Sequence, residues 1–377
     1  MVLPCSTRSR GQLAALLCIM ATALLGGCPA TSGTKRERSK RPHVHAVVAW
    51  SIGGAQSHSA YKDNIDAITV ASPAYYRVTF GQAGDTALVD WDVTNPVDRD
   101  QAREVARAGG AKLVPLVACL DSCARRISTL LAKPEARKKH IAVLLDAIKR
   151  DKTDGIFVDY EGLNCAAKDF TALIQELSAA LRADNKKLGI AITEPCGVDP
   201  SCKRPGYPFD IAALASSVDY LAVMEYDYAI DGSDAVAPRD WVRRGLLRVK
   251  REVGGNIDKV FVGVPFYGRI TRGLTSDTGV VWSEIHARKI QGKPITLSDK
   301  SYVASKLSYK ATVEVGGSRG KLYWDDHATL ASRIRLLESV GMRHIAVWRL
   351  GGEDPCAWSV IRAWQAKRLD AEVKCQR

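Results

Sequence analysis

The stretch Thr153–Gly162, TDGIFVDYEG, reads as a buried strand that ends in two carboxylates. Side chains alternate along a strand, so Phe157, Asp159 and Glu161 should point to one face. Residues two apart on one face lie roughly 6.5 Å apart at the backbone, so two carboxyl groups there can share a proton or a substrate. A like charge at this range raises the pKa of one of them, as a general acid requires. A pair that caps the next helix or faces water fits these residues equally well.

Outward from this stretch, apolar runs rich in Val and Ile alternate with helical patterns from residue 44 onward. The runs are continuous, as expected of parallel strands covered on both faces. They are Val44–Ile52, Ala67–Val78, Lys112–Cys119, Gly155–Glu161, Lys187–Pro195, Val218–Asp227, Lys259–Gly268 and His344–Gly351. Helices are expected at Arg99–Ala108, Ala124–Arg150, Ala167–Ala183, Pro238–Val253, Asp326–Val340 and Asp354–Arg368. This order predicts an α/β fold, a (β/α)8 TIM barrel. A doubly wound sheet is the competitor, but no Gly-x-Gly-x-x-Gly turn follows the first run.

Residues 269–325 interrupt this alternation and predict a small α+β insertion between strand 7 and its helix. Elements are expected at Val280–Ile290, Ser308–Val315 and Lys321–Trp324, with a glycine-rich turn at 316–320. Active sites of TIM barrels lie at the C-terminal ends of the strands. The insertion should therefore form a wall of the site.

The N-terminus has the pattern of a targeting signal. Arg8 and Arg10 precede an apolar run, Leu13–Leu25, that is too short to span a bilayer. The ending Leu25–Cys28, LGGC, resembles the lipobox of bacterial lipoproteins, in which the cysteine after the cut is lipidated. We expect a signal peptide at 1–27, a lipid on Cys28, a flexible tether at 28–42 and a catalytic domain at 43–377. This predicts a protein anchored to a membrane of the cell envelope, periplasmic or surface-facing; an ordinary signal peptide and secretion are the alternative.

The net charge of +13 does not indicate nucleic-acid binding. Residues 1–41 hold 6 of these charges, which leaves +7 for residue 42 onward. No basic stripe interleaved with aromatic residues follows residue 41, so no nucleic-acid partner is expected. The 7 histidines are scattered without metal-ligand spacing, so no metal is expected. We expect a monomer.

Export would favour disulfides among the cysteines that follow Cys28. We predict the bridges Cys196–Cys202 and Cys356–Cys375. Cys165 is expected to pair with Cys119 or Cys123, which leaves one thiol free. The short cysteine spacings are poor zinc signatures because no histidines lie near them.

Four of the predicted strands end in polar and aromatic residues. These endings are DYE at 159–161, MEYDY at 224–228, PFYGR at 265–269 and WRLGGE at 348–353. Aromatic rings beside carboxylates suit sugars, whose C–H faces pack on rings while carboxylates bind hydroxyls. Glu225 should instead face the helices.

These endings resemble glycoside hydrolase family 18. Residues 154–161, DGIFVDYE, resemble the family's strand-4 signature Asp-Gly-x-x-x-Asp-x-Glu. MEYD at 224–227 is similar to its strand-6 motif, GVPFYGR at 263–269 to its strand-7 motif, and Trp348 to its strand-8 tryptophan. The likeness is nearest to the spore-cortex-lytic and chitobiase-like branches, which act on peptidoglycan or short chitin-type oligosaccharides.

The resemblance implies a retaining glycosidase in which the substrate's 2-acetamido group is the nucleophile, and it implies no cofactor. Glu161 would be the acid and base, Asp159 would hold the acetamido N–H, and Tyr226 would bind its carbonyl. Further substrate contacts are expected from Asp227, Trp348, Tyr267, Arg269, Met224 and Trp50. The partner would be an oligosaccharide with 2-acetamido sugars, such as one containing β-linked N-acetylglucosamine. A lectin-like glycan-binding lipoprotein on the same fold is the alternative.

Phe157 departs from the family pattern, in which many members have an additional Asp. Asp159 would then lie over an apolar floor without an acidic neighbour beneath it. Burial would raise the pKa of Asp159 and the lost repulsion would lower it, so the sequence leaves the direction open.

Overall fold

The computed structural model describes residues 45–81, 87–91, 98–120, 122–197, 201–202, 204, 206–369 and 375. The predicted signal peptide, the lipidation site Cys28 and the tether lie outside the described residues. No helix within these ranges is both long and apolar enough to cross a membrane.

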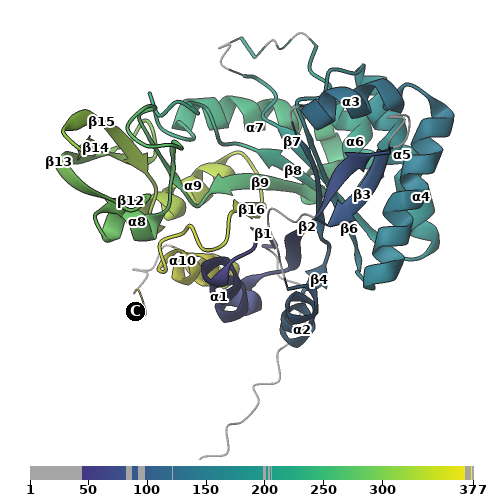
Figure 1. Cartoon of the computed structure of the whole chain (residues 1–377), viewed down its shortest axis with the longest axis horizontal. Coiled ribbons are helices and arrows are strands. Elements are labelled where there is room, and N and C mark those ends of the chain that lie inside the picture. Colours follow the sequence, from purple (N-terminus) through teal and green to yellow (C-terminus); the bar gives the residue numbers. More distant parts are fainter. Residues whose placement is uncertain are drawn as a thin grey trace, which may run out of the picture. The chain divides into compact units, whose positions relative to one another are not determined.

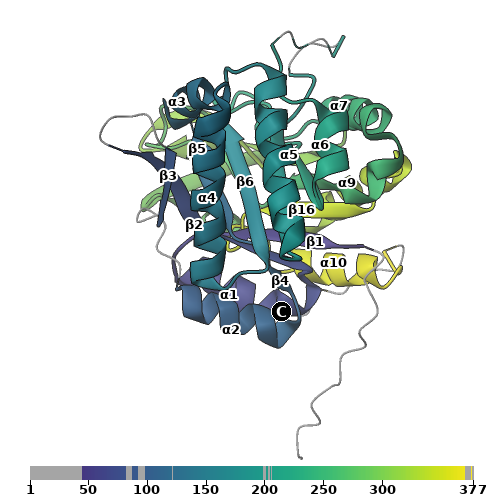
Figure 2. The same cartoon turned by 90° about the vertical axis from the view of Figure 1, so that its right-hand side faces the viewer.

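The described residues form a closed barrel of eight parallel strands with helices around it (Figures 1 and 2). The barrel strands are β1 (Val47–Ser51), β2 (Val70–Phe80), β5 (Leu116–Leu120), β6 (Gly155–Glu161), β7 (Lys187–Thr193), β8 (Tyr220–Met224), β9 (Val260–Pro265) and β16 (His344–Trp348). They follow one another in this order, and β16 pairs with β1 to close the ring. The predicted (β/α)8 barrel is confirmed, and all eight expected runs contribute a strand.

The observed helices differ from the predicted ones in three places. They are α1 (Ala55–Asn64), α2 (Arg99–Gly109), α3 (Ser122–Leu131), α4 (Pro134–Asp151), α5 (Ala167–Ala183), α6 (Ile211–Ser217), α7 (Arg239–Val253), α9 (His327–Ser339) and α10 (Ala357–Gln365), with 3-10 turns η1 (Ile65–Ala67) and η2 (Gly254–Lys259). The run predicted as one helix from 124 to 150 is two, because Pro134 starts a new helix at its first position. The sequence analysis missed α1, which buries only Ser57 and Tyr61, and the short α6.

Two short strands accompany β2 outside the ring. The expected run from 112 to 119 is divided into β4 (Lys112–Leu113) and β5, with Pro115, which has no N–H to donate, between them. The strand β3 (Ala87–Trp91) was not predicted and pairs antiparallel with the far end of β2.

The predicted insertion is a second, antiparallel sheet with its own core. Its strands are β10 (Gly268–Ile270), β11 (Gly279–Val280), β12 (Lys289–Ile290), β13 (Lys293–Val303), β14 (Ser308–Val315) and β15 (Ser318–Trp324), and α8 (Trp282–His286) lies between β11 and β12. The sequence analysis missed β13 because Ile295 is its only buried side chain. The glycine-rich turn is shorter than expected: Gly316 and Gly317 have positive φ, and β15 begins at Ser318.

The insertion contacts the loops that follow β8 and β16, at the C-terminal end of the barrel (Figure 1). Lys306 Nζ lies 2.6 Å from Asp234 Oδ2, in the loop after β8. The Trp282 backbone N–H donates to the carbonyl of Gly352, after β16, over 3.0 Å. The insertion therefore lies beside the strand ends where the site was expected.

The structure contains both predicted bridges, Cys196–Cys202 and Cys356–Cys375. The predicted pairing of Cys165 is wrong. Cys119 near the end of β5 bonds to Cys123 in the first turn of α3, and their Cα atoms lie 5.3 Å apart, within the range that a disulfide spans. Cys165 is a free, partly buried thiol.

Candidate active site

Strand β6 places its carboxylates as the alternation predicted. Tyr160 points to the helices, where its hydroxyl lies 2.7 Å from His140 Nε2 of α4. Phe157, Asp159 and Glu161 occupy the opposite face, toward the barrel interior. All residues of β6 are buried except Glu161, which is half-buried at the strand end.

Asp159 is 7 % exposed, and its Oδ1 atom has no hydrogen-bond partner among the described residues. Burial and, second, the nearby charge of Glu161 raise the pKa of Asp159 well above its usual value. This settles the direction that the sequence left open. Asp159 therefore holds a proton more readily than an ordinary aspartate does.

Phe157 forms the apolar floor beneath Asp159. It is fully buried, and a Cβ on Gly189 of β7 would overlap its ring, so Gly189 provides the space that Phe157 fills. The indole of Trp50 packs edge-on against Phe157 with ring centres 5.5 Å apart. Aromatic packing thus occupies the place of a further carboxylate.

Tyr226 and Asp227 follow β8 and face the same end of the barrel. Tyr226 is buried and packs edge-on against Tyr267, with ring centres 6.2 Å apart. Burial raises the pKa of Tyr226, and Tyr267, Glu161, Asp159 and Asp227 raise it further. The phenol therefore stays protonated and can donate a hydrogen bond. A Cβ on Gly263 would lie 2.7 Å from the Tyr226 ring, so the glycine makes room for it.

Asp227 is fixed by residues of the strand-7 motif. Tyr267 donates its hydroxyl to Asp227 Oδ1 over 2.6 Å, and Arg269 Nη2 lies 2.5 Å from the same oxygen. Arg269 is held in turn by Thr278 Oγ1 at 3.0 Å, in the insertion. Asp227 has a φ of 65°, an uncommon conformation for a residue with a side chain, and such strain gathers at functional sites.

Trp348, at the end of β16, is partly exposed, whereas Trp50 is not. The two rings pack edge-on with their centres 6.0 Å apart. Trp50 is 2 % exposed, so its assignment as a direct sugar contact is corrected. Trp50 supports Trp348 and Phe157 from below instead.

A cavity of about 310 Å³ opens beside Glu161. Its wall consists of residues that end or follow β6, β7 and β8 or lie on α7: Glu161, Thr193, Glu194, Gly197, Arg204, Met224, Tyr226, Asp227, Tyr228, Ile230 and Trp241. Four predicted site residues, Glu161, Met224, Tyr226 and Asp227, therefore meet in one hollow of the size of small-ligand sites. Sequence reasoning missed the contribution of β7, although Thr193 and Glu194 are polar residues at a strand end.

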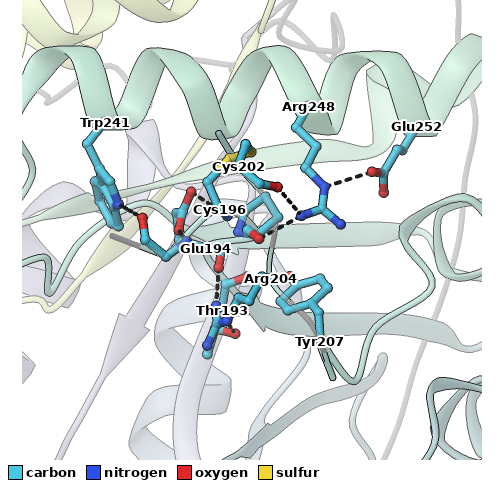
Figure 3. The surroundings of a disulfide bond; sticks show 11 residues. Thr193, Glu194, Cys196, Cys202, Arg204, Tyr207, Trp241, Arg248 and Glu252 are labelled. Atoms are coloured by element: carbon cyan, nitrogen blue, oxygen red, sulfur yellow. Dashed lines mark hydrogen bonds and ion pairs between the residues drawn. A yellow bond between two sulfur atoms is a disulfide. The ribbon is translucent and has the colours of Figure 1, made fainter. Parts of the chain in front are cut away.

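The loop after β7 is tied down from several sides (Figure 3). The Cys196–Cys202 disulfide closes it. Arg248 of α7 donates to the carbonyls of Pro195 and Cys202 over 2.8 and 3.2 Å. Trp241 Nε1 donates to the carbonyl of Gly197 over 2.7 Å. This wall of the cavity is therefore held against α7.

A second pair of acids meets beside α7: Glu194, which also lines this wall, and Glu225, which faces the helices as expected. A Cβ on Gly245 of α7 would lie 2.5 Å from Glu225 Oε1 and 2.8 Å from Glu194 Oε1, so both carboxyl groups converge on the space that this glycine leaves. Glu194 accepts hydrogen bonds from the N–H groups of Cys196 and Gly197. Neither oxygen of Glu225 has a partner among the described residues. Burial and the charge of Glu194 raise the pKa of Glu225 well above its usual value.

His327, Asp354 and Cys356 form the one cluster of metal-ligand side chains found within the described ranges. Asp354 Oδ2 lies 2.6 Å from His327 Nδ1. The sulfur of Cys356 is bonded to Cys375 and is not available as a thiolate. The cluster is therefore a hydrogen-bonded support for a disulfide.

Comparisons with known proteins agree with this geometry. The model of the family "Glycosyl hydrolases family 18" matches residues 120–353. The "Uncharacterized glycosylase YvbX" of Bacillus subtilis is 25 % identical over 243 residues, which cover 62 % of this chain and 68 % of that protein. The "Probable endochitinase" of Caenorhabditis elegans is 22 % identical, over 60 % of this chain and 41 % of its own length.

Two solved structures share the fold. A chitinase from Chromobacterium violaceum superposes with a TM-score of 0.69 at 23 % identity, over 87 % of this chain and 99 % of its own. The Bacillus cereus spore cortex-lytic enzyme SleL gives 0.68 at 15 % identity, over 84 % of this chain and 73 % of its own. The family model covers more than half of the chain, and Glu161 of the strand-4 signature lines the cavity. The chain therefore belongs to glycosyl hydrolase family 18.

Proposed function

We propose that the protein is a retaining glycosidase that hydrolyses β-linked N-acetylglucosamine-containing glycans. The observation that carries the proposal is the meeting of Asp159, Glu161 and Tyr226 at one end of the barrel. The names of similar proteins, a glycosylase, chitinases and a spore cortex-lytic enzyme, support the same reaction class.

In the first step, Glu161 donates its proton to the glycosidic oxygen. The carbonyl oxygen of the substrate's own acetamido group attacks the anomeric carbon, and the bond to the leaving sugar breaks. Tyr226 aligns the attack by donating its hydroxyl proton in a hydrogen bond to that carbonyl oxygen. The product of this step is a cyclic oxazolinium ion.

Asp159 stabilises the positive charge of this ion. It accepts a hydrogen bond from the acetamido N–H, and the nearby cation favours the ionised form of its carboxyl group, while the only proton transferred in this step comes from Glu161. Glu161, now ionised, accepts a proton from water, whose oxygen attacks the anomeric carbon and opens the ring. The configuration is retained because the anomeric carbon is attacked twice.

The test is digestion of chitotetraose and of purified peptidoglycan glycans by the full-length protein, followed by mass spectrometry. We expect shortened oligosaccharides with intact acetamido groups. Absence of cleavage from pH 4 to pH 8 would refute the proposal.

Phe157 favours a second candidate function, the binding of glycans without turnover. A phenyl ring beneath Asp159 cannot exchange a proton with it, unlike the carboxyl group that many family members have there. Tight binding of an oligosaccharide without product, measured by calorimetry on the same sample, would establish this function instead.

For the location, we propose export and lipidation of Cys28, which would hold the barrel at a membrane of the cell envelope near wall glycans. Metabolic labelling with a fatty-acid analogue tests this. The label should appear in the wild type and be absent from Cys28→Ala.

A further inference from the structure

We propose that Arg204 makes the site selective for glycans in which a carboxylate-bearing sugar lies next to the cleaved N-acetylglucosamine, in preference to neutral chitin-type chains. Muramic acid, whose lactyl group carries the carboxylate, is the sugar of this class in peptidoglycan. The inference rests on the proposed glycosidase function and narrows its substrate.

Arg204 lies in the wall of the cavity that Glu161 also lines, on the loop that follows β7 (Figure 3). It is exposed and is the only basic side chain among the described residues of that wall. A substituent of a sugar bound at Glu161 would therefore meet a guanidinium group on this side.

The acids of the wall leave this positive charge available. Asp227 is bound by Arg269 and Tyr267. Glu194 is 4 % exposed, and its carboxyl group accepts hydrogen bonds from the backbone N–H groups of Cys196 and Gly197. The proposed role of Glu161 as the general acid requires its carboxyl group to be neutral when the substrate binds.

The guanidinium group has hydrogen-bond donors to spare. Its Nη1 donates to the backbone carbonyl of Glu194 and, over 3.4 Å, to Thr193 Oγ1. Its Nε and Nη2 donate no hydrogen bond to any described residue. An arginine has five N–H donors in a planar fork that matches a carboxylate, so one edge positions Arg204 and the rest can bind a ligand.

The guanidinium group is also fixed before any ligand arrives. It lies 5.1 Å from the ring centre of Tyr207, whose hydroxyl donates to the carbonyl of Thr193 over 2.5 Å. The disulfide and Arg248 hold the same loop. A side chain ordered in advance loses less entropy on binding, which strengthens the contact.

The charge of the whole chain agrees with an acidic substrate. Residues 42–377 carry a net charge of +7, which attracts a polyanionic glycan over a distance. In a polymer that alternates N-acetylglucosamine with muramic acid, both neighbours of each N-acetylglucosamine carry a lactyl group. Arg204 would therefore meet one whichever way the chain lies in the cavity.

The test compares tetrasaccharides that differ in one group. The first alternates N-acetylglucosamine with muramic acid and has free lactyl carboxylates; the second has the same sugars with lactyl amides; the third is chitotetraose. A fourth carries the stem peptide on its lactyl group, so that its carboxylates belong to the peptide. Hydrolysis by the full-length protein gives kcat/KM for each.

For the wild type we expect kcat/KM to be at least about tenfold higher for the free acid than for the amide, the effect of one charge-assisted hydrogen bond. Arg204→Gln should bring this ratio close to one, mainly through a higher KM for the acid. Arg204→Lys should keep part of the preference because it keeps the charge. Preference for the peptide-bearing substrate over both the free acid and the amide would contradict recognition of the lactyl carboxylate.

Arg319→Gln is the matched control, because Arg319 is 77 % exposed in its side chain and lies in the insertion hairpin, away from the cavity wall. It removes the same charge and should leave the acid-to-amide ratio as it is. If Arg204→Gln lowers kcat/KM equally for acid and amide, Arg204 only ties the loop and the proposal is wrong.

The inference and the proposed function fail in different ways. If the wild type cleaves acid and amide equally well, glycosidase activity stands and the role of Arg204 falls. If the wild type cleaves none of the four, the proposed function fails. Calorimetry with the free acid and the amide then still measures the preference, and equal dissociation constants would overturn the inference as well.

Discussion

Two pairs of carboxylic acids lie at the ends of neighbouring barrel strands, and they differ in what they face. Asp159 and Glu161 stand on one strand, β6, on the face toward the barrel interior, and Glu161 lines the cavity. Glu194 and Glu225 follow β7 and β8, and their carboxyl groups meet at Gly245 of α7, although Glu194 also lines the cavity. Burial raises the pKa of Asp159, Glu194 and Glu225 alike.

The difference shows that a raised pKa does not by itself mark a catalytic residue. In the proposed mechanism, a substrate bound at Glu161 brings positive charge close to Asp159 and takes a proton from Glu161. Glu194 instead accepts hydrogen bonds from two backbone N–H groups and supports the loop, while the burial of Glu225, which is 1 % exposed, favours its protonated form. Asp159 and Glu161 are the open pair, which a substrate can reach through Glu161. Glu194 and Glu225, which meet at α7, are the closed pair.

The largest expected effect is a loss of kcat when an acid of the open pair is changed, which the matched change in the closed pair should not cause. Glu161→Gln keeps the shape of the side chain but removes the transferable proton, so kcat on chitotetraose should fall about 10³-fold. Glu225→Gln makes the matched change behind the wall and should leave kcat within about twofold of the wild type. Steady-state kinetics of the two variants check this. Equal losses in both would show that the buried pair takes part in the chemistry.

Asp159→Asn tests the second member of the open pair. It removes the carboxylate that answers the oxazolinium charge, so kcat should fall about 10²-fold with little change in KM. The melting temperature should not fall, because burial already favours the neutral form of Asp159.

Asp154→Asn is the control at the opposite end of the same strand. Asp154 Oδ2 accepts the backbone N–H of Leu113 over 2.9 Å, so this change should cost stability and leave kcat as it is. A similar loss of kcat in both variants would mean that Asp159 acts only through the fold.

Gly245→Ala tests whether the closed pair depends on the space in α7. Alanine normally favours a helix over glycine, but here its Cβ would lie 2.5 to 2.8 Å from three carboxylate oxygens. Such overpacking should lower the free energy of unfolding by about 2 kcal/mol, measured by urea denaturation.

Gly255→Ala is the control, because its Cβ would meet nothing within 4 Å and its φ is not positive. The double variant Gly245→Ala/Glu225→Ala should recover part of the loss, since it removes two of the three oxygens in contact. If Gly245→Ala is as stable as Gly255→Ala, the carboxyl groups do not fill that space.

The sequence predicted the barrel and the open pair far better than the closed pair. Eight continuous apolar runs predict parallel strands, because both faces of such strands are buried. The two carboxylates of β6 lie two residues apart, so the alternation of side chains places them on the same face. The sequence did not predict β13, because a mostly exposed strand has no apolar pattern. Trp50 was misjudged because alternation gives the face of a residue but not its depth below the surface.

Long-range contacts explain the remaining gaps. The sequence placed Glu225 toward the helices but gave no reason to expect Glu194 or Gly245 beside it, because the three lie on separate elements. The pairing of Cys119 with Cys123 depends on where the start of α3 lies relative to the end of β5, which cysteine spacing alone does not specify. The position of Arg204 depends on a disulfide and on Tyr207, both fixed by the fold.

The smallest expected effect is the pH dependence of stability in Glu225→Gln. The folded protein holds the proton of Glu225 to higher pH than the unfolded chain, so the unfolded chain ionises first as the pH rises through about 4.5. The folded state then binds more protons, and the stability of the wild type falls with rising pH until Glu225 ionises in the folded state too. Glutamine mimics the protonated form and removes this fall. The free energy of unfolding of the variant, measured by urea denaturation, should therefore match that of the wild type below pH 4 and exceed it at pH 8. A constant difference across this range would mean that Glu225 ionises alike in both states, and the closed pair would then hold no proton.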